Sequence, residues 1–176
     1  LTVMARACEM IRERHGVELD IHSIPLDDPG TFELLGRGDV LGVFQVEGAG
    51  MRRNLMEMRP HSLANVIAMV ALYRPGPMEN IPSYIRRMHG EEEVFYLHPK
   101  LESILSKTYG VAIYQEQVMQ IARDLAGFSM GEADVLRKAM GKKKADLLAE
   151  QKEKFINGCI KNDISKTLAE KIYTFI

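Results

Sequence analysis

Apolar residues recur at helical spacing along most of the chain, and this pattern predicts a mainly helical protein. The first helix is predicted over residues 2–15, where the apolar side chains near one face are Val3, Ala7, Met10 and Ile11. Further helices are predicted over 30–35, 50–58, 63–73, 83–88, 115–126, 129–140 and 144–161, and a last helix after Ser165. Residues 74–82, with three prolines and a glycine, interrupt this series.

Polar residues at the starts of these segments support the helix boundaries. Asp28 is a predicted N-cap with Pro29 at the first helical position. Ser62 is placed to cap the helix over 63–73, which is apolar nearly all round and is therefore expected at the centre of the core. Ser129 and Glu132 have the spacing of a capping box.

Two short segments favour strands over helices. Residues 40–46, "VLGVFQV", are rich in β-branched side chains and too short for a helix. Residues 110–114, "GVAIY", resemble a second strand. The expected fold class is therefore mainly α, with one or two short β-strands.

The length of 176 residues suffices for a sizeable domain with a hydrophobic core. The longest apolar run, residues 66–73, is far shorter than the roughly 20 residues that span a bilayer. Cys8 and Cys159, the only cysteines, fit a reducing compartment better than a disulfide framework. Both ends of the sequence fall inside helical patterns, so we expect a piece of a longer polypeptide.

Positive charge gathers in the stretch "DVLRKAMGKKKADLL", residues 134–148, although the net charge of the chain is only −1. Five cations fall within eight residues: Arg137, Lys138, Lys142, Lys143 and Lys144. If Leu136 and Met140 pack inward, Arg137 projects to one side and Lys144 lies about two turns further along the same side, which forms a basic ridge that can bind phosphates. The alternative is an ordinary solvated helix face, and the residues alone leave both interpretations open.

Two other polar residues are candidate ligand contacts. Arg74 leaves a buried helix into a stiff Pro-Gly-Pro turn that would fix its direction toward an anion, or it pairs with a carboxylate or caps the helix end. Gln115 opens the helix over 115–126, where it could line a site or cap backbone amides.

Other chemistries find little support in the sequence. The five histidines are scattered without metal-ligand spacing, and no set of carboxylates can be nominated for two-metal chemistry. No serine stands in a nucleophile-elbow pattern. The basic stretch is not a Walker A loop, because residue 136, six positions before Lys142, is leucine and not glycine.

Several of these stretches, taken together and in order, resemble the α subunit of bacterial DNA polymerase III, the C-family replicative polymerase. The similar segments cover nearly the whole chain: "LTVMARACEMI", "IPLDDPGTFELLGRGDVLGVFQVEGAGMR", "VALYRPGP", "TYGVAIYQEQVMQIA" and "GEADVLRKAMGKKK". The resemblance implies the helical fingers domain, with residues 1–46 as the connection from the palm and 47–176 as the fingers core. It also implies that the catalytic aspartates lie in the palm, so this chain would hold no catalytic residue and would not polymerise by itself.

The resemblance further implies a role for the cations. The family's fingers bind the triphosphate of the incoming dNTP, and Arg137 and Lys138 stand at the matching positions. Lys138 replaces an arginine of many relatives, which keeps the charge but loses the bidentate geometry. Three lysines would extend this positive field or contact template or primer phosphates: Lys142, Lys143 and Lys144. Arg74 and Gln115 are weaker candidates for lining the nucleotide pocket.

Cofactor and partners follow from the same resemblance. We expect Mg²⁺ bound by palm carboxylates outside this chain, primer–template DNA and dNTP as ligands, and a cytoplasmic location without a membrane. The sliding clamp and the proofreading exonuclease would bind elsewhere on the parent protein. Two alternatives are a non-enzymatic helical module that binds nucleic acid through the ridge Arg137–Lys144, and a purely structural helical domain.

Overall fold

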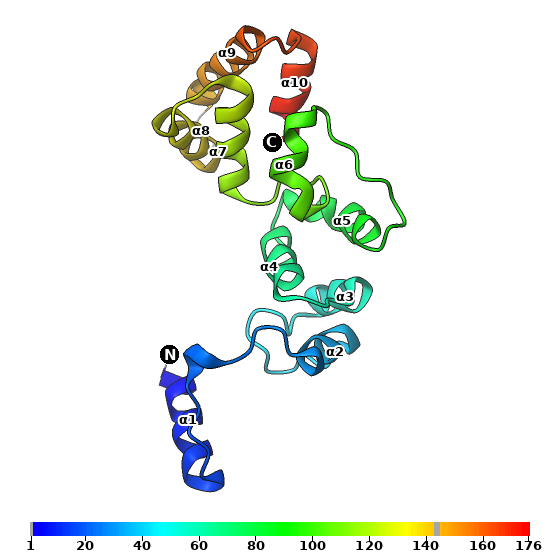
Figure 1. Cartoon of the computed structure of the whole chain (residues 1–176), viewed down its shortest axis with the longest axis vertical. Helices are drawn as coiled ribbons and strands as arrows, with labels where there is room; N and C mark the ends of the chain where they lie inside the picture. The colour runs from blue at the N-terminus through cyan, green and yellow to red at the C-terminus, as the bar shows by residue number, and fades with distance from the viewer. Residues whose placement is uncertain (1, 143–144) are drawn as a thin grey trace.

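The structure, a computed structural model, describes residues 2–142 and 145–176. Figure 1 shows the helices following one another along the long axis, with α1 at one end and α7–α10 at the other. The α-helices are α1 Thr2–His15, α2 Pro29–Arg37, α3 Ala49–Met58, α4 Leu63–Leu72, α5 Ile81–Met88, α6 Glu102–Leu105, α7 Gln115–Ala126, α8 Met130–Lys142, α9 Ala145–Lys161 and α10 Lys166–Phe175. Short 3₁₀ turns are η1 Ile21–Ser23, η2 Pro77–Asn80, η3 Pro99–Leu101 and η4 Ser106–Thr108.

The mainly α prediction is confirmed, and the polar caps explain where several helices begin. Asp28 Oδ2 accepts a hydrogen bond from the Thr31 amide at 2.8 Å, with Pro29 as the first residue of α2. The hydroxyls of Ser62 and Ser165 accept from amides three residues further along in the same way. Local sequence therefore fixes these helix starts without help from distant residues.

The predicted strand at residues 40–46 is wrong, and no β-strand occurs within residues 2–142 or 145–176. The segment instead forms consecutive turns, in which the Val43 amide donates to the Val40 carbonyl at 3.0 Å. Gly42 and Gln45 have left-handed backbone, with φ of 78° and 68°, and this conformation cannot continue an extended strand.

The predicted strand at residues 110–114 is also wrong. Residues 111–113 have no regular secondary structure, and the amides of Ile113 and Tyr114 donate to Oε1 of Gln117, at 2.8 and 2.9 Å. The side chain of Gln117 therefore accepts the hydrogen bonds from these two backbone amides, which in a β-sheet would go to the carbonyls of a neighbouring strand.

The buried side chains fall into two clusters. The N-terminal cluster joins α2–α5 with the turns at 40–46, and its fully buried members include Leu55, Met58, Met69 and Leu72. The C-terminal cluster joins η3 and α6–α10 around Phe155, Ile121, Leu125 and Leu136. Each cluster is built mainly from helices that are close in the sequence.

Two helices are more exposed than their apolar content suggests. The described residues of α1 include no buried side chain, and Val3 is 83% exposed. Helix α4 buries Ala68, Met69 and Leu72 but exposes half of Ile67, so it is not surrounded by the core on all sides as predicted. The predicted division of the chain at residue 46 stays a prediction.

The capping box that starts α8 is confirmed and is joined to α9. Glu132 Oε2 accepts from the backbone amide and hydroxyl of Ser129, at 2.7 and 2.8 Å, and Oε1 pairs with Lys154 Nζ at 2.7 Å. The Lys154 ammonium, followed by the Ser129 donors, lowers the pKa of Glu132 from its ordinary value of 4.5 to about 2. This carboxylate therefore stabilises the fold only when it is ionised.

We expect Glu132→Gln to reduce stability in a pH-dependent way. Because the folded-state pKa is depressed, the contribution of Glu132 is complete above pH 4.5 and is lost as the pH falls toward 2. Urea unfolding of both proteins should therefore show the largest difference in midpoint near neutral pH and a shrinking difference in acid. A difference that stays constant across this range would contradict the prediction.

Candidate functional site

The candidate site lies where α7 meets α8, and Arg137 of α8 is its central residue. The Nε and Nη2 atoms of Arg137 donate to one carboxylate oxygen, Oδ1 of Asp134, at 2.9 and 2.8 Å. Its Nη1 donates to Oε1 of Gln115, the first residue of α7, at 2.9 Å. The structure thus brings two of the predicted site residues, Arg137 and Gln115, into direct contact.

Lys138 shares the same acidic partner. Its Nζ lies 2.6 Å from Oδ2 of Asp134. The side chains of Arg137 and Asp134 are 31% and 34% exposed, and that of Lys138 is 56% exposed. Two cations and one anion therefore form a cluster with a net positive charge that solvent can reach.

Helix geometry explains this arrangement. Asp134, Arg137 and Lys138 are related by three and four positions, so they lie on one face of α8. The residues that turn toward the C-terminal cluster are fully buried: Ala133, Leu136 and Ala139. The predicted inward packing of Leu136 is confirmed, and it leaves the charged side of the helix at the surface.

The pKa of Asp134 lies below its ordinary value of 3.8, first because of the hydrogen bond from Lys138 and then because of that from Arg137. The carboxylate is therefore ionised at neutral pH and neutralises part of the charge of its partners. Ion pairs with this exposure are weak in water, so a more highly charged anion can compete for both cations.

A buried amide fixes the start of α7 and hence the position of Gln115. Gln117 is 7% exposed, and its Nε2 donates to the hydroxyl of Thr108 at 2.8 Å and to the carbonyl of Ile104 at 3.2 Å. Its Oε1 accepts from two backbone amides just before the helix. The four hydrogen bonds tie α6, η4 and α7 together two residues away from Gln115.

The remaining predicted site residues are not part of this cluster. Arg74 is exposed after the end of α4, and no hydrogen bond or ion pair within residues 2–142 and 145–176 joins it to Arg137. Lys142 is the last residue of α8. Lys143 and Lys144 lie outside the described residues, so their proposed phosphate contacts stay predictions.

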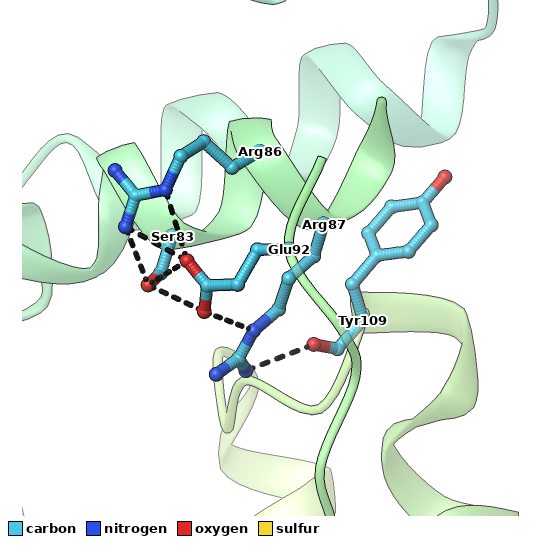
Figure 2. A network of polar contacts seen from close by, with 5 residues as sticks. All are labelled: Ser83, Arg86, Arg87, Glu92 and Tyr109. Atoms are coloured by element: carbon cyan, nitrogen blue, oxygen red, sulfur yellow. Dashed lines mark hydrogen bonds and ion pairs between the residues drawn. The ribbon is translucent and has the colours of Figure 1, made fainter. Parts of the chain in front are cut away.

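Sequence reasoning missed Asp134, although its spacing from Arg137 and Lys138 is the signal that identifies such pairs. It also missed a polar network between α5 and Glu92, which follows this helix, as Figure 2 shows. Glu92 Oε1 accepts from Arg87 Nε at 2.7 Å, and Oε2 accepts from Arg86 Nη2, also at 2.7 Å. The Ser83 hydroxyl lies 2.9 Å from both oxygens.

This network connects two parts of the chain that precede α7. Arg87 also donates through Nη1 to the backbone carbonyl of Tyr109 at 3.2 Å, as Figure 2 shows. Hydrogen bonds from Ser83, then Arg86 and Arg87, lower the pKa of Glu92. The network holds Glu92 against α5, and Arg87 joins this helix to the turn at Tyr109, which leads into the loop before α7.

Neither a cluster of metal-binding side chains nor a membrane-spanning helix is found in the part of the chain that the structure describes. No group of three or more His, Cys, Asp or Glu side chains there is arranged to hold a metal ion. No described helix is both long and apolar enough to cross a bilayer.

Comparison with known proteins agrees with the resemblance in the sequence. The family model described as the bacterial DNA polymerase III alpha subunit finger domain matches residues 1–163. The chain belongs to this finger-domain family.

Curated relatives match over the full length of the chain. The DNA polymerase III subunit alpha of Halalkalibacterium halodurans is 49% identical over 176 residues, and those of Thermus aquaticus and Bacillus subtilis are each 47% identical. These alignments cover 100% of this chain but only 15–16% of each relative. The chain therefore spans about one sixth of the length of the polymerase subunits that it matches.

Proposed function

We propose that this chain is the finger part of a DNA-directed DNA polymerase and that the α7–α8 cluster binds the triphosphate of the incoming dNTP. The observation that carries the proposal is the arrangement of Arg137 and Lys138. Both cations converge on one carboxylate at the surface of α8, and Gln115 contacts Arg137 from α7. The sequence identity to DNA polymerase III alpha subunits supports the same proposal.

The chemistry of nucleotide transfer explains why such a cluster is useful. Charge develops on the phosphates, and catalysis depends on positioning them and on neutralising that charge. The guanidinium of Arg137 can bind two phosphate oxygens at once, whereas the Lys138 ammonium acts as a point charge. Any Mg²⁺ would be bound by carboxylates of the palm, outside this chain.

The proposal includes weaker contacts and partners of the whole polymerase. Lys142, Lys143 and Lys144 would extend the positive field or contact template or primer phosphates, and Arg74 would be a weaker contact that lines the nucleotide pocket. A sliding clamp and a proofreading exonuclease would bind outside this chain. The polymerase would work in the cytoplasm.

Steady-state primer extension by the full-length polymerase that carries this chain tests the triphosphate site. We expect Arg137→Ala to raise the apparent KM for dNTP about tenfold, because one charge-assisted contact to a phosphate is lost. Arg123→Ala is the matched control, since Arg123 lies on α7 and pairs with Asp124 at 2.7 Å but is two helical turns from Gln115.

An unchanged KM and kcat for Arg137→Ala would sink the proposed site. A normal KM for dNTP combined with weaker binding of primer–template DNA would favour the nucleic-acid-binding module instead. Equal effects of Arg137→Ala and the Arg123→Ala control would show that the basic surface acts only through its general charge.

A further inference from the structure

Asp134 is in contact with both cations of the proposed triphosphate site. Its Oδ1 accepts from Nε and Nη2 of Arg137, and its Oδ2 lies 2.6 Å from Lys138 Nζ. A carboxylate with two oxygens between a guanidinium and an ammonium resembles the way in which a phosphate group would contact the same donors. The anion that occupies the cluster in this structure is therefore part of the protein itself.

The guanidinium of Arg137 donates hydrogen bonds to two different residues, Asp134 and Gln115. A guanidinium has five N–H groups, and the described contacts use one on Nε, one on Nη2 and one on Nη1. Within the described part of the chain, this leaves one further N–H on each terminal nitrogen. Asp134 and Gln115 thus orient the guanidinium and still leave its end available to a ligand.

The exposure of the cluster determines whether Asp134 can be displaced. The Asp134 side chain is 34% exposed and that of Lys138 is 56% exposed, so water already screens their attraction. A nucleoside triphosphate carries several negative charges. Arg137 and Lys138 therefore each attract a triphosphate more strongly than a single carboxylate. Lys138, the more exposed partner, is the cation that a phosphate can take over with the least rearrangement.

We infer that Asp134 is a positioning residue, which holds Arg137 and Lys138 in place before nucleotide binds and competes with the nucleotide's phosphates for them. This inference rests on the proposed function of the α7–α8 cluster. It assigns Asp134 two opposing effects on affinity. Its hydrogen bonds orient the cations and favour binding, whereas its negative charge repels the phosphates.

Two substitutions separate these effects. Asp134→Asn removes the charge and the contact of Oδ2 with Lys138, but it keeps one oxygen that can accept from Arg137, so the competition is lost while Arg137 stays oriented. Asp134→Ala removes the charge and the acceptor together. We therefore expect Asp134→Asn to bind polyphosphate about three- to tenfold more tightly than the unmodified protein, and Asp134→Ala to gain clearly less.

The experiment measures the dissociation constant of inorganic tripolyphosphate by titration calorimetry on the full-length polymerase that carries this chain. Tripolyphosphate probes the phosphate contacts without base pairing. Asp124→Asn is the matched control, because Asp124 pairs with Arg123 on α7 and is 29% exposed, close to the exposure of Asp134. Hydrogen exchange of α8 amides checks that each variant keeps the helix folded.

The outcomes distinguish this inference from the proposed function. If Arg137→Ala does not weaken tripolyphosphate binding, the proposed site fails. If Arg137→Ala weakens binding but Asp134→Asn leaves it unchanged or weaker, the competing role of Asp134 is overturned. Equal gains for Asp134→Asn and Asp134→Ala would overturn the positioning role, and a gain for Asp124→Asn of the same size would reduce the effect to general charge.

Discussion

Replacing Gln117 with leucine is expected to lower the free energy of unfolding by about 2–4 kcal/mol. Leucine has nearly the same volume, so the buried space stays filled. The cost arises because the substitution removes four hydrogen bonds, including those to the amides of Ile113 and Tyr114. Polar groups that stay in a mostly buried region without partners account for most of this loss.

Equilibrium unfolding in urea measures the effect, and Gln120→Leu is the matched control. Gln120 belongs to the same helix and is exposed, so its substitution should change stability by less than about 0.5 kcal/mol. Hydrogen exchange adds a local measurement, because the amides of Ile113 and Tyr114 should lose protection first. Equal stability losses for the two variants would contradict a special role of Gln117.

The Gln117→Leu substitution is also expected to affect the candidate site. Gln117 fixes the first turn of α7, and Gln115 in that turn accepts from Arg137. A looser start of α7 would therefore weaken the orientation of the guanidinium while leaving its ion pair with Asp134 in place.

Replacing Gly158 with alanine gives the second large effect, a loss of about 1–3 kcal/mol in the free energy of unfolding. A methyl group at Gly158 would overlap the backbone carbonyl oxygen of Ala126, and it would lie 3.0 Å from the carbonyl carbon and 3.1 Å from Cβ of the same residue. Ala126 is the last residue of α7, and Gly158 lies in α9. The side-chain amide of Asn162, just after α9, donates to the carbonyl of Leu125 and keeps the end of α7 close to α9. Helices α7 and α9 must therefore move apart to accept the methyl group.

Gly131→Ala is the control for the intrinsic preference of alanine for helices. Gly131 lies in α8, and apart from its chain neighbours and the nearby backbone of its own helix no atom lies within 4 Å of the position that its methyl group would take. This variant should gain up to about 1 kcal/mol. Urea unfolding of both variants compares the two glycines directly, and a stabilised Gly158→Ala protein would show that α7 and α9 adapt without cost.

Most helices of this chain could be predicted from the sequence because their signals are local. Asp28, Ser62, Ser129 and Ser165 each cap a helix within three or four residues of their own position. Apolar spacing then extends each helix from its cap. Nothing outside the segment is needed to form such a pattern.

The strand predictions failed because they depend on partners that a single segment cannot reveal. Residues 40–46 have strand-like composition, yet Leu41 and Phe44 are 96% and 86% exposed while Val40 and Val46 are buried. In this turn the first and last residues are buried in the core, and most of the residues between them face the solvent. At 111–114 the deciding residue is Gln117, whose buried amide replaces a neighbouring strand.

The candidate site was predicted in part. Its cations were visible as a cluster in the sequence, and Asp134 could have been found from helical spacing alone. The contact between Gln115 and Arg137 could not, because it depends on how α7 packs against α8. Arg74 was grouped with these residues by its turn and charge, but its place after α4 puts it next to the N-terminal cluster.

The separation of the buried side chains into two clusters has a consequence for how the chain folds as it is synthesised. Nearly all of the N-terminal cluster lies between Phe32 and Ile85, so it is complete, apart from Val111, before the residues of α7–α10 leave the ribosome. Contacts between neighbours in sequence form quickly, because short loops cost little entropy to close. We therefore expect the chain to fold in the order of its synthesis, in which α2–α5 pack together first and α7–α10 pack against one another afterwards.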